Sequence, residues 1–145
     1  ERHARSAQRV AEHLSGHPAV ARVHHPGLKD SPWHAAARAY LPRGAASVFS
    51  FDLHPTGDPD ADFARVEAFI DRLDVFRLVA NIGDARSLVA HPASMTHSHL
   101  TARQLADAGI SSTTVRVSIG LEDVDDIIGD LDHALAAVPA PSPAG

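Results

Sequence analysis

Hydrophobic residues recur every three or four positions in three stretches of the chain, a spacing typical of amphipathic helices. The pattern predicts one helix from Arg2 to Leu14, a second that begins at Asp58-Pro59, and a third, the clearest, from Val124 to Leu135. The apolar positions are Ala7, Val10, Ala11 and Leu14; Val66, Phe69, Ile70 and Leu73; and Val124, Ile127, Ile128, Leu131 and Leu135. We expect each helix to bury this one face.

Polar caps, prolines and glycines indicate where further helices begin and end. Ser31-Pro32 is typical of an N-cap followed by Pro at the first helical position, and predicts a short helix that extends to about residue 40. Thr101 and Gln104 form a predicted capping box, and Gly109 would end that helix. Gly16 follows the first helix, where a C-terminus favours a positive φ.

Short apolar or alternating runs predict five strands between these helices. They are Val20 to His24, Ala46 to Leu53, Val75 to Ala80, Ser87 to His91 and Thr114 to Ile119. The tight turn Asn81-Ile82-Gly83-Asp84 is typical of a hairpin, which favours antiparallel pairing of the strands around it. The sequence therefore predicts an α+β domain, with a small mixed or antiparallel sheet and helices packed on one face.

Composition restricts the compartment and the partners. A chain of 145 residues with 44% apolar content can bury the core of one domain. The net charge of -5 is spread over alternating signs, and no apolar run approaches the roughly 20 residues of a membrane span. We therefore expect neither a nucleic-acid nor a membrane partner. The absence of cysteine excludes a disulfide framework and a thiol nucleophile, and suits the cytoplasm.

The two ends of the chain carry separate expectations. The first residue, Glu1, lies at the start of a predicted helix and is neither Met nor part of a signal peptide. We interpret this as a chain that lost its N-terminal part; a mature N-terminus left by processing is the alternative. Pro139 to Gly145 is a Pro/Ala/Ser tail, for which we predict disorder. The domain is expected to span residues 1–138.

The histidines and acids do not predict a catalytic centre. His97 and His99, like the pair His24-His25, lack a third ligand at zinc-site spacing, so no metal site is predicted. No Gly-x-Ser-x-Gly elbow supports a serine hydrolase. The acids Asp125-Asp126 lie in the first turn of a helix, where negative charge stabilises the dipole. These patterns therefore point to no catalytic group.

The single lysine is equally uninformative for catalysis. A lysine that forms a Schiff base needs a desolvated or cationic setting. Lys29 lies in a Pro/Gly loop beside Asp30, which is neither. We expect a solvated side chain.

Arg116 is the residue whose setting is chemically unusual. Because strand side chains alternate, Val115 and Val117 point to one face, and Arg116 shares the other with Thr114 and Ser118. A mid-strand arginine is costly unless an anion meets it, and its planar fork fits a carboxylate through two parallel hydrogen bonds. An ion pair with an Asp or Glu of the same chain remains the alternative to an external ligand.

Two long motifs resemble the C-terminal domain of the Cys/Met-metabolism family of pyridoxal-phosphate enzymes. They are NIGDARSLVAHPASMTHSHL and GISSTTVRVSIGLEDVDDIIGDLDHAL. The resemblance extends to ERHARSAQRVAEHLSGHPAVARVHHPGL, where His25 replaces the usual Tyr, and to GAASVFSFDL. It implies the small domain of a fold-type-I enzyme of the aspartate-aminotransferase type.

The resemblance also implies roles for particular residues. In the family the substrate's α-carboxylate is held by an arginine that matches Arg116, and from a turn that matches Asn81 and the backbone amide of Ile82. The loop from Pro92 to His97 would lie near the mouth of the active site. The Schiff-base lysine and the remaining cofactor contacts belong to a preceding large domain, so the resemblance also implies that no catalytic residue lies in this chain. Pyridoxal phosphate is therefore expected in the full-length enzyme and not on this chain alone, which should be inactive.

One departure within the motifs indicates a branch of the family. Asn81-Ile82-Gly83 replaces the Ser-Leu-Gly usual in the lyases and γ-synthases, and resembles the O-acetylhomoserine sulfhydrylases. These enzymes make homocysteine or methionine from O-acetylhomoserine and sulfide or methanethiol. Such enzymes are homo-oligomers, commonly tetramers, in which this domain also contacts its own large domain.

Three alternatives remain open at this point. The first is another member of the family: cystathionine γ-synthase, methionine γ-lyase or O-succinylhomoserine sulfhydrylase. The second is a stand-alone module that binds a small carboxylate without catalysis. The third is a degenerate domain with only a packing role.

Overall fold

The computed structural model describes residues 1–95 and 101–138, which form a five-stranded sheet with helices packed on one face. The strands are β1 (Val20–His24), β2 (Val48–Leu53), β3 (Arg77–Leu78), β4 (Leu88–Ala90) and β5 (Thr114–Ser118). The helices are α1 (Arg2–Ser15), α2 (His34–Tyr40), α3 (Pro59–Ile70), α4 (Pro92–Met95), α5 (Ala102–Asp107) and α6 (Val124–Ala136). The predicted α+β class with a mixed sheet is confirmed.

The sheet has the order β1-β2-β5-β4-β3. The pairs β1–β2, β2–β5 and β5–β4 are antiparallel, whereas β3 and β4 are parallel. The predicted hairpin between β3 and β4 is therefore wrong. Residues 79–87 return the chain to the end of the sheet where β3 begins, so β4 runs in the same direction as β3. The Arg77 amide donates to the carbonyl of Ser87, and the Val79 amide donates to the carbonyl of Val89.

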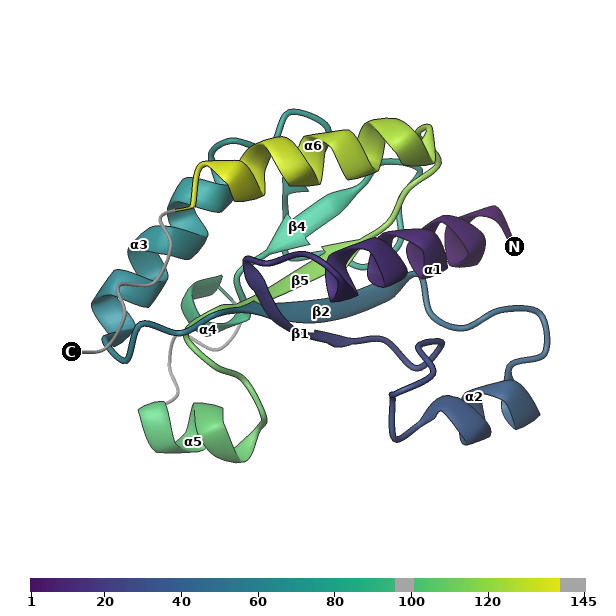
Figure 1. The fold of residues 1–145 in the computed structure, drawn as a ribbon, viewed down its shortest axis with the longest axis horizontal. Helices are drawn as coiled ribbons and strands as arrows, with labels where there is room; N and C mark the ends of the chain where they lie inside the picture. Colours follow the sequence, from purple (N-terminus) through teal and green to yellow (C-terminus); the bar gives the residue numbers. More distant parts are fainter. Residues whose placement is uncertain (96–100, 139–145) are drawn as a thin grey trace.

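The core lies between the sheet and the helices α1, α3 and α6, which lie along one face (Figure 1). Strand β2 shows the alternation most clearly, because Phe49, Phe51 and Leu53 are buried while the residues between them are half-buried. Phe51 meets Phe69 of α3 edge to face, with 5.9 Å between the ring centroids. The predicted apolar faces of the three long helices are thus the ones that are buried.

Helix ends follow the predicted caps in two cases. Asp58 caps α3 by accepting from the amide of Asp60 at 3.0 Å. The Thr101–Gln104 capping box is also present, with the Gln104 amide donating to Thr101 Oγ1 at 3.3 Å and the Thr101 amide donating to Gln104 Oε1 at 2.9 Å.

Two other helix ends were predicted wrongly. Gly16 has φ of -97°, because the turn stays right-handed and the Gly16 amide donates to the carbonyls of His13 and Leu14. Helix α2 begins at His34 and not at Pro32, because Ser31 Oγ accepts from the Trp33 amide in a turn that precedes the helix. Helix α2 buries no residue, and it projects from the molecule together with α5 (Figure 1).

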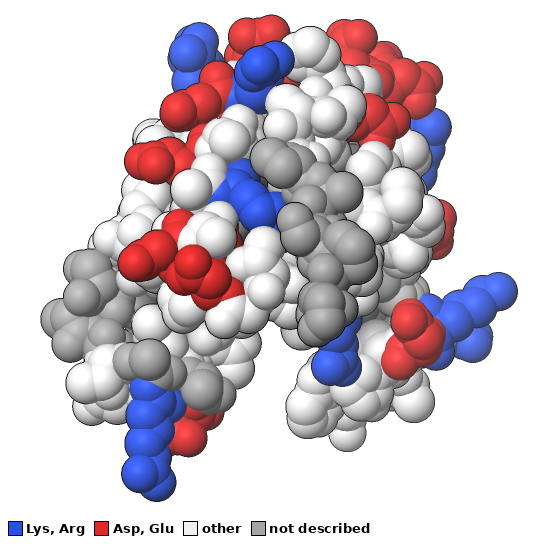
Figure 2. Space-filling model, turned by 60° about the vertical axis from the view of Figure 1, so that its left-hand side comes forward, with Lys and Arg blue, Asp and Glu red and all other residues white. Residues whose placement is uncertain are grey.

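Surface charge agrees with the mixed sequence pattern. In Figure 2 basic and acidic side chains are interspersed over most of the face shown, and a group of acidic side chains lies at its upper right. Within residues 1–95 and 101–138, no helix is both long and apolar enough to span a membrane. The predicted tail, residues 139–145, lies outside the described residues.

Candidate functional site

The face of the sheet opposite the core helices carries the polar residues of β5. Val115 and Val117 point into the core, which leaves Thr114, Arg116 and Ser118 on the other face, as the alternation predicted. Thr114 and Ser118 are buried, and Arg116 is half-buried. The site is thus built on a central strand, whose backbone is held on both sides.

Arg116 has no acidic partner in the described structure. Its Cα is opposite Ser50 of β2 and Ala90 of β4, and neither residue is charged. No Asp or Glu within residues 1–95 and 101–138 lies within 4.0 Å of the guanidinium, and residues 96–100 and 139–145 contain no acidic side chain. The intramolecular ion pair, which the sequence left open, is therefore not formed. A half-buried guanidinium with five N–H donors remains available for an anion.

A cavity of about 330 Å³ adjoins Arg116. Strand residues Ser50, Thr114 and Arg116 form its floor, with His24 from the end of β1 at one side. Its other walls include Pro92 at the start of α4 and Gly109 after α5. The volume suits a ligand the size of an amino acid, since small-molecule sites begin at about 300 Å³.

The 79–87 segment is bonded to the end of β5 and to the residues that follow it, but none of its residues lines this cavity. The Gly83 amide donates to Ser118 Oγ at 3.2 Å, and the Leu121 amide donates to the carbonyl of Ala85 at 2.8 Å. Because Ser118 shares its sheet face with Arg116, the segment that carries Asn81 and Ile82 is brought to the same face. Gly83 has φ of +78°, a conformation that favours glycine.

Asn81 and Ile82 adopt a local arrangement that the sequence did not predict. The Ile82 amide donates to Asn81 Oδ1 at 2.8 Å, so this amide already has a hydrogen-bond acceptor within the turn. Both side chains are exposed, and that of Ile82 is 62% exposed. A carboxylate would have to replace Asn81 Oδ1 as the acceptor of this amide.

A buried polar network holds the 79–87 segment from behind. The amide and hydroxyl of Ser87 donate to the two carboxylate oxygens of Glu122 at 2.7 and 2.9 Å, and the Gly120 amide donates to Ser87 Oγ at 3.0 Å. The sequence did not predict this network, because Ser87 was interpreted only as the first residue of a strand. Gly120 and Glu122, directly after β5, were the available signal.

His91 is a second buried polar group, next in the chain to the cavity residue Pro92. Its Nδ1 lies 2.9 Å from Ser94 Oγ, and its Nε2 lies 2.9 Å from the Ser112 carbonyl. Burial lowers the pKa of the imidazole below 6.5, although the bond to Ser112 and the charge of Glu67 oppose the shift. His91 therefore joins the end of β4 to the loop before β5. Of the predicted mouth loop, Pro92 lines the cavity, while Thr96 and His97 lie outside the described residues.

The other histidines singled out by the sequence have structural partners. His24 Nε2 lies 2.6 Å from Asp52 Oδ2. His25 is buried, accepts from the Gly27 amide, and lies 3.0 Å from the Ala46 carbonyl. No group of three metal-ligating side chains occurs in the described part of the chain, and His97 and His99 lie outside it.

Comparison with known proteins identifies the family to which this fold and site belong. The family model for Cys/Met metabolism PLP-dependent enzymes matches residues 1–136. The O-acetyl-L-homoserine sulfhydrylase of Corynebacterium glutamicum is 45% identical over 138 residues, which are 95% of this chain and 30% of that relative. The O-succinylhomoserine sulfhydrylase of Mycobacterium tuberculosis is 41% identical over 90% of this chain and 32% of its own length.

A solved structure shows the same fold. It comes from Campylobacter jejuni, is assigned as an O-acetylhomoserine (thiol)-lyase, and contains a pyridoxyl-lysine monophosphate. It superimposes with a TM-score of 0.84 at 37% identity, over 93% of this chain and 31% of that chain. The chain thus spans about a third of the length of the proteins it matches. On its fold and on a match that runs through nearly every described residue, the chain belongs to the family of Cys/Met metabolism PLP-dependent enzymes.

Proposed function

We propose that residues 1–138 form the C-terminal, substrate-carboxylate-binding domain of a pyridoxal-phosphate-dependent O-acetylhomoserine sulfhydrylase. The single observation that carries this proposal is the guanidinium of Arg116, half-buried at a cavity and without an acidic partner in the described structure. In the longer protein, O-acetylhomoserine and sulfide or methanethiol would give homocysteine or methionine by replacement at Cγ. The long match to O-acetyl-L-homoserine sulfhydrylase supports the choice of substrate.

Arg116 would hold the α-carboxylate through two parallel hydrogen bonds. The Ile82 amide would add a donor once Asn81 Oδ1 moves aside, and the Gly83–Ser118 bond keeps that amide at the correct face. A substrate fixed in this way presents its amino group and side chain in one orientation. Such positioning supplies a large part of the rate acceleration when an enzyme brings two reactants together. This chain's contribution is therefore binding and orientation.

The residues present here do not fit the covalent attachment of the cofactor. Lys29, the one lysine of the sequence, is exposed beside Asp30, which is also exposed. Pyridoxal phosphate, when bound, serves as an electron sink for charge that develops on the substrate. We propose that the lysine and the remaining cofactor contacts belong to a large domain encoded before Glu1, that catalysis needs both domains, and that the full protein is a cytoplasmic homo-oligomer.

Another activity within the same family is the second candidate. The O-succinylhomoserine sulfhydrylase of Mycobacterium tuberculosis is nearly as similar as the O-acetyl-L-homoserine sulfhydrylase of Corynebacterium glutamicum, at 41% against 45% identity. The cystathionine γ-synthase and methionine γ-lyase activities would use the same carboxylate anchor.

The experiment is to read the gene upstream of Glu1, express the whole product and measure its activity. Four substrates separate the candidates: O-acetylhomoserine with sulfide, O-succinylhomoserine with sulfide, O-succinylhomoserine with cysteine, and methionine alone. We expect the first to give the highest kcat/KM. A start codon just before Glu1 would overturn the proposal and favour a free-standing carboxylate-binding module.

A further inference from the structure

A charged pair lies at one side of the Arg116 cavity, on the same sheet face. His24 of β1 contacts Asp52 of β2, with 2.6 Å between Nε2 and Oδ2. The other carboxylate oxygen of Asp52 accepts from Thr114 Oγ1 of β5, also at 2.6 Å. Asp52 is thus held from two neighbouring strands. It does not itself line the cavity, but its carboxylate contacts two residues that do, His24 and Thr114.

The sheet register fixes where this pair lies relative to Arg116. His24 is opposite Ser50, and Ser50 is opposite Arg116, so the three residues form one row across β1, β2 and β5. Since directly opposite Cβ atoms are about 5 Å apart, the row spans about 10 Å. A small amino acid that is bound by its carboxylate at Arg116 and lies along this row would have its far end close to His24.

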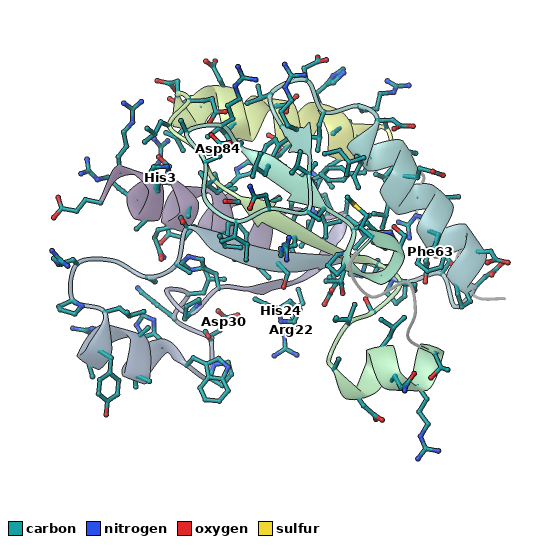
Figure 3. All side chains as sticks on the ribbon, turned by 180° about the vertical axis from the view of Figure 1, so that it is seen from behind. His3, Arg22, His24, Asp30, Phe63 and Asp84 are labelled. Carbon is teal, nitrogen blue, oxygen red and sulfur yellow. The ribbon has the colours of Figure 1, made fainter. Side chains whose placement is uncertain are left out.

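The pair adds no net positive charge to that end of the cavity. If His24 is neutral, the pair carries the charge of Asp52, and if His24 is protonated, the pair is neutral. Arg22 is opposite Asp52 in the register and projects on the same side as His24 (Figure 3), but among the described residues the one ion pair of Asp52 is with His24, and Arg22 lines a neighbouring cavity together with Asp30. Arg116 is then the one uncompensated cation of its own cavity among the described lining residues.

We propose that the His24–Asp52 pair is a specificity determinant, which makes the cavity accept a substrate with one carboxylate and reject one whose side chain ends in a second carboxylate. This inference rests on the proposed function, because it assumes that Arg116 binds the α-carboxylate. Specificity of this kind comes from a repulsive element, here the Asp52 carboxylate, and not from an additional attraction. The favoured substrate class is an α-amino acid with an uncharged acyl ester, and the disfavoured class carries a succinyl ester.

The two members of the pair give variants with opposite expected effects. Asp52→Asn removes the negative charge while its side-chain oxygen can still accept from Thr114. His24→Gln leaves the carboxylate of Asp52 without its imidazole partner. The selectivity for the acetyl compound should therefore fall in Asp52→Asn and increase in His24→Gln.

The test measures the dissociation constants of O-acetyl-L-homoserine and O-succinyl-L-homoserine for this chain, from amide chemical shifts. Wild type should bind the acetyl compound about tenfold more tightly, the factor expected for like charges in a partly hydrated cavity. Asp52→Asn should reduce the ratio to about one. The amide spectrum of each variant shows whether it is folded. If Asp52→Asn is unfolded, His24→Gln decides alone: a raised ratio supports the proposal, and an unchanged or lowered ratio overturns it.

Two results would overturn parts of the account separately. Equal affinities in wild type, or a ratio that His24→Gln leaves unchanged or lowers, would overturn the role of the pair while leaving carboxylate binding intact. Binding of both compounds that persists unchanged in Arg116→Met, or no binding of either, would overturn the proposed function, and the specificity inference with it.

Discussion

The Gly83 amide donates a hydrogen bond to Ser118 Oγ at 3.2 Å, which fixes the 79–87 segment on the face of β5 that carries Arg116. The two residues are 35 positions apart in the sequence. The link explains how a turn that does not form a hairpin can still contribute to the candidate carboxylate site.

Ser118→Ala should loosen this segment. Ser118 is buried, and the loss of one hydrogen bond should lower the free energy of unfolding by about 1 kcal/mol. Hydrogen exchange at the Gly83 amide should become faster. Ser15→Ala, which removes an exposed bond to the carbonyl of Glu12, is the matched control and should leave Gly83 exchange unchanged. Unaltered Gly83 protection in Ser118→Ala would contradict the proposed link.

Gly120→Ala and Gly129→Ala should change stability in opposite directions. A Cβ at Gly120 would lie 2.5 Å from the backbone nitrogen of Ser87, where the buried network leaves no space, whereas a Cβ at Gly129 in α6 meets no atom within 4 Å. We expect Gly120→Ala to cost about 1–3 kcal/mol and Gly129→Ala to add about 0.5–1 kcal/mol. Urea unfolding of both variants measures the two effects. If the two variants changed the free energy of unfolding equally, close packing around Gly120 would not be the reason why this position requires glycine.

The sequence predicted those parts of the fold that depend on local pattern. The three amphipathic helices, the Asp58 cap, the Thr101–Gln104 box and the alternation of β5 each follow from side chains near one another in the chain. The resemblance to known enzymes also placed Arg116 in the candidate site.

The predictions that failed depended on distant contacts. The parallel pairing of β3 and β4 follows from where residues 79–87 dock, and that in turn depends on Ser118 and Glu122. Likewise, the His24–Asp52 pair exists because β1 and β2 are neighbours, which no spacing within β1 reveals.

Stability should fall as the pH falls below neutrality, because of two buried imidazoles. Burial lowers the pKa of His25 and of His91 below 6.5 in the folded protein, although bonds to the carbonyls of Ala46 and Ser112 oppose the shift. The unfolded chain therefore binds these protons more readily than the folded one. The stability contributed by the neutral imidazoles is complete above a pH of about 6.5 and is lost as the pH falls toward their folded-state values.

Urea midpoints measured between about pH 7.5 and pH 5 test this sign. His91→Gln retains a donor for the Ser112 carbonyl but does not titrate, so the loss of stability on acidification should be smaller in this variant. His3→Gln, at an exposed bond to the Asp84 carbonyl, is the control and should keep the wild-type slope (Figure 3). An identical slope in His91→Gln would show that His91 is not one of the groups responsible.

The most direct test of the account is a titration of this chain with O-acetyl-L-homoserine, followed through the side-chain N–H of Arg116 and the backbone amides of Ser50 and Gly83. We predict saturable shifts at these three positions in wild type, their loss in Arg116→Met, and an unchanged response in Arg72→Met, which alters an exposed arginine at the end of α3. Shifts that survive in Arg116→Met, or that occur only away from β5, would contradict the claim that Arg116 is the carboxylate anchor.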